Sequence, residues 1–166
     1  GQYYVLVANM ESDPQMVAYN RTWTGLENVE DYLRVIFENL AADGYSYTDL
    51  SESEFPFAQH VRRPAETLME ESGNCVDGSV LFASFLESVG LEPVLLQRPG
   101  HMFVAVRLSE GGGIVPIETT MVGRSTYDAA VARGVEEVAS YSDAGTLTVI
   151  DVAETRARGL SPIPYD

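Results

Sequence analysis

The sequence contains no lysine, because all ten of its basic residues are arginine. This absence excludes a phosphate-binding loop ending in Gly-Lys-Ser/Thr, a Schiff-base lysine and a pyridoxal attachment. Positively charged residues are few compared with the 25 acidic residues, and the formal net charge is −15. An acidic surface repels phosphate backbones, so we expect no nucleic-acid partner.

Cysteine and histidine are also scarce: the chain has Cys75, His60 and His101 and no others. A lone cysteine cannot form an intrachain disulfide, a CxxC redox pair or a four-cysteine zinc site. Two histidines separated by 41 positions cannot form a helical pair of metal ligands. We therefore expect no metal and no cofactor.

Long hydrophobic runs are missing as well. No apolar run approaches the ~18 residues that suggest a membrane span, and no signal peptide opens the chain. Because the sequence begins with Gly1, we expect a piece of a longer protein, and an exported or membrane-anchored form stays open. At 166 residues the chain suits one domain and is short for two, so we predict a single domain over 1–166.

Hydrophobic periodicity predicts helices first and then a mostly antiparallel sheet, which is typical of an α+β fold. Asn28 and Pro64 are suited to begin helices, and Gly44 and Gly90 are suited to end them. The expected helices cover residues from 28 to before Gly44, 64–71, 75–89, 127–138 and 152–158, and the expected strands cover 2–8, 92–97, 101–108, 114–120 and 146–150.

The most informative helix begins at Cys75, after Asn74 as its N-cap. Its middle, S-V-L-F-A-S-F-L, is apolar nearly all round, which indicates a buried helix. In the first turn of a helix, the unpaired N–H groups and the dipole stabilise a thiolate. A free cysteine can equally be a small buried apolar residue, and position alone leaves both interpretations open.

His101 opens the strand that follows Pro99-Gly100, and it is the candidate base for a Cys75 nucleophile. If Glu110-Gly111 is a two-residue turn, residues paired across the hairpin have numbers that sum to 221. Glu118 then lies diagonally from His101 on the same face of the sheet, within reach of its ring. The alternatives are a structural histidine at a turn and a Glu118 carboxylate paired with an arginine such as Arg107.

Other polar residues have weaker claims to a catalytic role. Asp77 lies two residues from Cys75 on one helix and so points away from it, and Asp151 remains a possible third group. His60 is interpreted as structural or cleft-lining. The pair Arg62-Arg63 could hold a substrate carboxylate, although a structural salt bridge is the safer interpretation.

Four segments together resemble the bacterial transglutaminase-like cysteine enzymes. They are V-R-R-P-A-E-T-L (61–68), E-S-G-N-C-V-D-G-S-V-L-F-A-S-F-L-E-S-V-G-L-E-P (71–93), P-G-H-M-F-V-A-V (99–106) and P-I-E-T-T (116–120). The resemblance covers the motif core 61–120 and implies a papain-like α+β fold, with a central buried helix that carries the cysteine and packs on the sheet.

The resemblance also implies a Cys–His–acid triad, with Cys75 as nucleophile, His101 as base and Glu118 as the orienting carboxylate. This chain departs from the family's pattern in having Glu rather than Asp at the third position. One oxyanion donor would be the backbone N–H of Cys75. Papain-type enzymes use a Gln six positions before the cysteine, where Met69 stands, so Gln59 and Asn74 are the remaining oxyanion or cleft candidates.

From these residues we expect a thiol enzyme that acts on amide bonds through a Cys75 thioester, most simply a peptidase or amidase acting on a protein or peptide. The alternative is a catalytically silent binding or scaffold domain that keeps the fold. The oligomeric state stays open.

Overall fold

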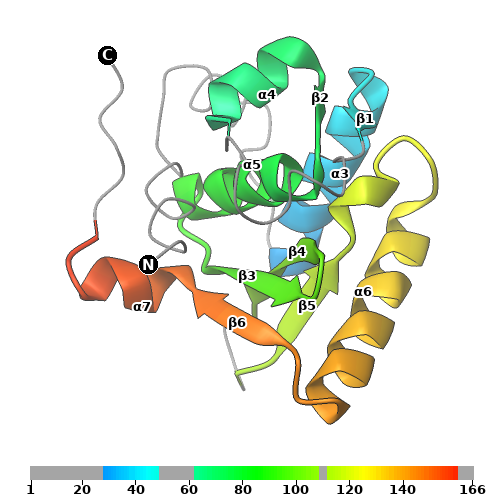
Figure 1. Cartoon of the computed structure of the whole chain (residues 1–166). Helices are drawn as coiled ribbons and strands as arrows, with labels where there is room; N and C mark the ends of the chain where they lie inside the picture. The colour runs from blue at the N-terminus through cyan, green and yellow to red at the C-terminus, as the bar shows by residue number, and fades with distance from the viewer. Residues whose placement is uncertain (1–27, 49–61, 109–111, 161–166) are drawn as a thin grey trace.

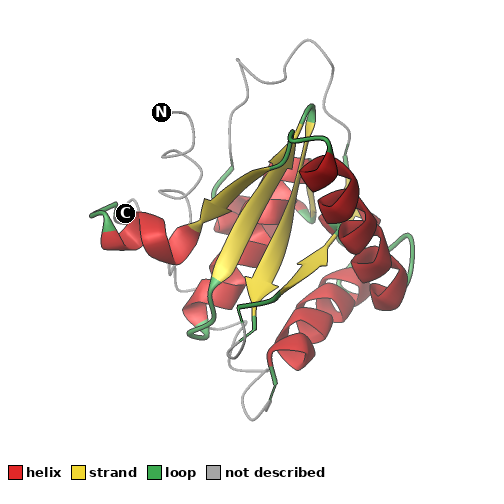
Figure 2. Cartoon of the chain, turned by 90° about the horizontal axis from the view of Figure 1, so that it is seen from below, coloured by secondary structure: helices red, strands yellow, loops and turns green. Residues whose placement is uncertain are grey.

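The computed structural model describes residues 28–48, 62–108 and 112–160. Figure 1 shows its helices and strands, and Figure 2 shows the sheet from below. In chain order the elements are α3 (Val29–Ala42), β1 (Ser46–Tyr47), α4 (Pro64–Glu70), β2 (Ser72–Gly73), α5 (Cys75–Ser88), β3 (Pro93–Arg98), β4 (His101–Arg107), β5 (Ile114–Ile117), the 3₁₀ helix η2 (Thr119–Met121), α6 (Tyr127–Asp143), β6 (Thr148–Asp151) and α7 (Val152–Ala157).

A four-stranded antiparallel sheet, in the order β5-β4-β3-β6, is the centre of the fold. A separate parallel pair joins β1 to β2. The predicted α+β class is thereby confirmed. The predicted hairpin register is confirmed too, because Val104 pairs with Ile117 and Arg107 with Ile114, and both pairs sum to 221. The turn residues proposed for this hairpin and the strand expected over 2–8 lie outside the described residues.

Helix α5 is the most buried element, as its apolar sequence predicts. Every residue from Cys75 to Leu86 is buried, and the helix packs against β3 and β4 on one face of the sheet. Strand residues Leu95, Val104 and Val106 belong to the same core as this helix, together with residues of α3. On the opposite face, Val94, Leu96, Phe103 and Ala105 form a smaller cluster with Val138 of α6.

Three helices begin where the sequence predicts: α3 after Asn28, α4 at Pro64 and α5 after Asn74. The Asn28 side chain accepts a hydrogen bond from the Asp31 amide, and the Asn74 side chain accepts from the amides of Val76 and Asp77. Pro64 occupies the first turn of α4. The two asparagine caps bind N–H groups that have no partner within the first turn of a helix.

Most predicted boundaries lie within two residues of the observed ones, but two are wrong by three residues or more. The third hairpin strand was expected to reach Thr120, but β5 ends at Ile117 because Glu118 caps the 3₁₀ helix that follows. Helix α6 continues to Asp143, five residues past the predicted end at Val138. Its C-terminal residues carry no apolar periodicity, so the sequence pattern stops before the helix does. Among the described helices, none combines the length and apolarity that crossing a membrane requires.

Candidate active site

Cys75 is the first residue of α5, and its residue surface is 3% exposed. The helix start is held by a reciprocal cap: Asp77 accepts from the Asn74 amide while Asn74 accepts from the Asp77 amide. The backbone N–H of Cys75 stands at the first helical position, where the helix itself offers no acceptor. The sulfur is therefore buried at the positive end of the helix dipole.

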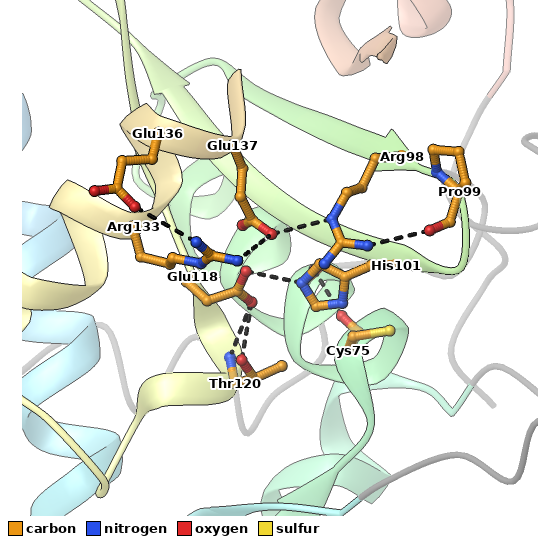
Figure 3. A network of polar contacts seen from close by, with 10 residues as sticks. Cys75, Arg98, Pro99, His101, Glu118, Thr120, Arg133, Glu136 and Glu137 are labelled. Atoms are coloured by element: carbon orange, nitrogen blue, oxygen red, sulfur yellow. Dashed lines mark hydrogen bonds and ion pairs between the residues drawn. The ribbon is translucent and has the colours of Figure 1, made fainter. Parts of the chain in front are cut away.

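His101 is the first residue of β4, and its side chain lies beside Cys75 at the end of the sheet (Figure 3). Its Nε2 is 2.8 Å from Oε2 of Glu118, and Nδ1 is on the side of Cys75. Phe103 stacks on the ring with centroids 6.2 Å apart. Burial by itself lowers the pKa of His101, but hydrogen bonds with Cys75 and Glu118, reinforced by their charges, outweigh it and raise the pKa to about 9.

Glu118 lies between β5 and η2, and its residue surface is 4% exposed. Its Oε1 accepts from the Oγ1 hydroxyl of Thr120 at 3.0 Å and from the Thr120 amide at 3.5 Å. Burial raises the pKa of this carboxyl, whereas the hydrogen bond with His101 and others with Glu137 and Thr120 outweigh burial and hold the pKa below its usual value. Glu118 is thus a fixed carboxylate behind the imidazole.

A second buried carboxyl, Glu137 of α6, was not identified from the sequence. Its residue surface is 2% exposed, and its Oε1 is 3.0 Å from Nε of Arg98 and 3.9 Å from Nη2 of Arg133. A signal for it existed, because Glu137 follows Ala130 and Gly134 at helical spacing and therefore shares their buried face. Figure 3 shows Glu137 and its two arginines next to Glu118 and His101.

Three of these side chains could geometrically hold a metal ion. His101, Glu118 and Glu137 each offer one ligand atom, and the three atoms lie within 4.8 Å of one another. The positive charge at this cluster is, however, already supplied by Arg98 and Arg133.

The other sequence candidates have partners other than Cys75 and His101. Asp77 accepts from the Arg62 amide at 3.1 Å in addition to its capping role. Asp151 is bound by Arg107, at 3.0 Å from Nε and 2.6 Å from Nη2, and caps α7. The Arg62 guanidinium donates to the carbonyl of Ser72.

Of the two oxyanion candidates, Asn74 is among the described residues and Gln59 is not. The side chain of Asn74 is engaged as the cap of α5. Met69, at the position where papain-type enzymes carry Gln, is 73% exposed. Gln59 and His60 lie outside the described residues.

The arrangement brings together an ionisable sulfur, an imidazole that lies beside Cys75 and a buried carboxylate that binds the imidazole. Side chains of this kind can form and resolve an acyl-enzyme. No family model matches the chain, and neither the curated proteins nor the solved structures contain a match to it.

Proposed function

We propose that this protein is a transglutaminase-like thiol enzyme, a peptidase or amidase, with its α+β elements arranged as in the papain-like fold. The single observation that carries the proposal is the position of His101 between Cys75 and Glu118: its Nε2 is 2.8 Å from Oε2 of Glu118, and its Nδ1 is on the side of Cys75 (Figure 3). A histidine that serves only packing needs no sulfur on one side and a buried carboxylate on the other.

In the first half-reaction, the Cys75 thiolate attacks the carbonyl carbon of an amide and forms a C–S bond. The carbonyl oxygen becomes an oxyanion, which the backbone N–H of Cys75, at the first position of α5, would stabilise. The protonated ring of His101 then donates its proton to the departing nitrogen as the C–N bond breaks. An amine leaves, and a thioester on Cys75 remains.

In the second half-reaction, neutral His101 takes a proton from water while the water oxygen attacks the thioester carbonyl. The C–S bond breaks, the carboxylic acid product leaves, and the thiolate–imidazolium pair is restored. Glu118 stabilises the positive ring in both halves through the contact with Nε2. An amine in place of water gives acyl transfer, and any lysine acceptor comes from another molecule because this chain has none.

A catalytically silent scaffold is the second candidate, and the burial of Cys75 favours it. A residue that is 3% exposed is typical of a cysteine packed as a small apolar side chain. The two candidates differ in one measurable property, the reactivity of the sulfur toward an electrophile at a pH where an ordinary thiol is protonated.

The test is the second-order rate of alkylation by iodoacetamide between pH 5 and pH 10. Cys75 is the only cysteine, so the whole signal belongs to it. We expect the intact protein to react at pH 6 about tenfold or more faster than glutathione, because an ordinary thiol has little thiolate at that pH. His101→Ala should remove this advantage.

His60→Ala is the matched control, since it removes the other histidine of the chain and should leave the rate unchanged. An intact protein that follows the pH dependence of glutathione would overturn the proposal and support the scaffold. Fluorogenic peptide amides, with and without an added primary amine, then distinguish hydrolysis from acyl transfer.

A further inference from the structure

The proposed mechanism uses Cys75, His101 and Glu118 and gives no role to Glu137. The Oε2 atom of Glu137 is buried and, as an ionised oxygen, has no hydrogen-bond donor among the described residues. Most buried polar atoms have a partner, so such an atom calls for a physical explanation. A role for Glu137 at this site rests on the proposed function, because the group that it contacts is the acid of the triad.

The groups around Glu137 show which partner is available. Glu118 approaches it from the end of β5. One carboxylate oxygen of Glu118, one of Glu137 and one ring nitrogen of His101 all lie within 4.8 Å of one another. Arg98 of β3 and Arg133 of α6 both contact Oε1, so neither of these contacts takes up Oε2. The remaining nearby acid, Glu136, faces Arg133 and is exposed.

Two ionised carboxylates cannot hydrogen-bond to each other, because neither carries a donor. A single proton on Glu137 changes this relationship, since Oε2 then donates and Glu118 accepts. Burial, the largest cause, raises the pKa of Glu137 to about 7, the hydrogen bond with Glu118 and its charge act in the same direction, and Arg98 opposes them. The same hydrogen bond helps to lower the pKa of Glu118.

The packing of α6 brings the two acids together. A Cβ on Gly134 would lie 3.0 Å from both the Ile117 nitrogen and the Pro116 carbonyl carbon, so this glycine allows α6 to lie against the backbone of β5. The Glu118 amide donates to the carbonyl of Ala130 at 3.2 Å, which attaches the chain at Glu118 to the same helix. Glu137 lies about one turn beyond Gly134 and is thereby placed behind Glu118.

We propose that Glu137 is a positioning residue for the triad: its protonated carboxyl donates a hydrogen bond from Oε2 to Glu118, so that the two acids share one proton. Arg98 and Arg133 hold Oε1 of Glu137, and the hydrogen bond from Oε2 restrains Glu118 in the position from which it binds Nε2 of His101. With one proton between them, Glu118 and Glu137 together carry a single negative charge beside the His101 ring. When Glu137 ionises, a second negative charge arises close to His101 and stabilises its protonated form.

The first test is a pair of NMR titrations of the full chain that need no substrate. With carboxyl-¹³C glutamate, one carboxyl should titrate near neutrality, and this resonance should be absent from Glu137→Gln. The ring of His101, one of two histidines in the chain, is followed in the same samples. Because Gln cannot ionise, Glu137→Gln should lower the alkaline midpoint of His101 by about one pH unit.

Glu136→Gln is the matched control, because it makes the same chemical change one residue away, at a side chain that contacts Arg133 and is exposed. It should leave both midpoints within about 0.2 unit, since an exposed charge is screened. In a Glu118→Gln background, Glu137 should titrate lower than in the intact protein, because the neighbouring negative charge is gone. A Glu137 that titrates in the ordinary range of glutamate in the intact protein would overturn the proposal.

The second test is the rate of Cys75 alkylation by iodoacetamide at pH 6, where Glu137 is protonated. Glu137→Gln keeps a donor toward Glu118 and an acceptor toward Arg98, so it should react within about twofold of the intact protein. Glu137→Ala should lose about tenfold or more, as expected when the orienting group is misplaced. Equal rates in the two variants would show that no donor is needed and would contradict the proposal.

The two tests together distinguish failure of the shared proton from failure of the thiol enzyme. If the intact protein shows the carboxyl titration but no enhanced alkylation, the shared proton is supported and the thiol enzyme is not. If alkylation is enhanced but Glu137 titrates as an ordinary acid, the thiol enzyme is supported and the shared proton is rejected.

Discussion

His101 donates from Nε2 to Oε2 of Glu118 across 2.8 Å, and both side chains are largely excluded from solvent. The contact joins the first residue of β4 to the cap of η2, seventeen positions further along the chain. A buried imidazole ordinarily loses its proton more readily, so the raised pKa of His101 depends on the partners that outweigh burial.

Replacement of Glu118 by Gln should therefore lower the pKa of His101. The amide oxygen can still accept from Nε2, but the negative charge that stabilises the imidazolium is lost. We expect a fall of about one unit or more in the midpoint of the His101 ring, measured by NMR, and a lower rate of Cys75 alkylation at pH 6. Asp151→Asn is the control, since Asp151 binds Arg107 rather than the imidazole, and it should change neither quantity.

Replacement of Asp77 by Ala should destabilise the start of α5. Asp77 is 2% exposed and accepts from the amides of Asn74 and Arg62, so its loss leaves buried donors without a partner. We expect urea unfolding to show a loss of about 2 kcal/mol. Glu66→Ala removes the equivalent cap of α4 from the Arg63 amide at an exposed position, and should cost about 0.5 kcal/mol. Equal losses would show that burial of the cap does not matter.

Replacement of Gly134 by Ala should destabilise the protein, although alanine is the better helix former by about 1 kcal/mol. The new methyl group would lie 3.0 Å from backbone atoms of Pro116 and Ile117, which cannot move aside as a flexible side chain can. We expect a net loss of about 1–3 kcal/mol in urea unfolding, as for other overpacked sites. Because α6 would be displaced from β5, Cys75 should also alkylate more slowly at pH 6. A more stable variant would contradict the close packing.

The stability that His101 contributes should fall as the pH rises from 6.5 toward 9. The pKa of His101 is 6.5 in the unfolded chain and about 9 in the folded protein, so the folded state keeps a proton that the unfolded state releases. The contribution of His101 is complete below pH 6.5 and is lost as the pH passes through 9; its full size is at most about 3 kcal/mol. Because a thiolate on Cys75 would release a proton on folding and offset this loss, the difference is measured in a Cys75→Ser background. Urea unfolding of Cys75→Ser, with and without His101→Gln, should show it between pH 6 and pH 9.

His60→Gln in the same background serves as the control for this pH dependence, and it should keep the slope of Cys75→Ser. A slope that survives in His101→Gln would assign the effect to other groups, such as the coupled acids Glu118 and Glu137.

Much of the fold was predictable from short-range patterns. Asn28 and Asn74 begin helices because their side chains accept from amides two or three residues away, and this preference can be recognised in a sequence. The hairpin register was predictable from the parity of a two-residue turn, and the pairing of Val104 with Ile117 confirms it. The same parity put Glu118 on the side of His101, but it did not predict that β5 ends at Ile117, where the Glu118 side chain begins a 3₁₀ helix.

Glu137 shows where such patterns stop. An acid on a helix is normally solvated, and nothing within a few residues indicates that Arg98, 39 positions away, will bind it. The end of α6 was missed for a related reason, because its last residues are polar and carry no periodic signal.

The sequence alone determined the caps, the buried helix and the face on which each strand residue lies, since these depend on backbone geometry and on neighbours a few residues away. The tertiary structure decided the burial of Cys75, the 2.8 Å contact of His101 with Glu118, and the closeness of Glu118 to Glu137. Desolvation and charge act through space and grow as water is excluded, so their strength is set only when distant elements pack together.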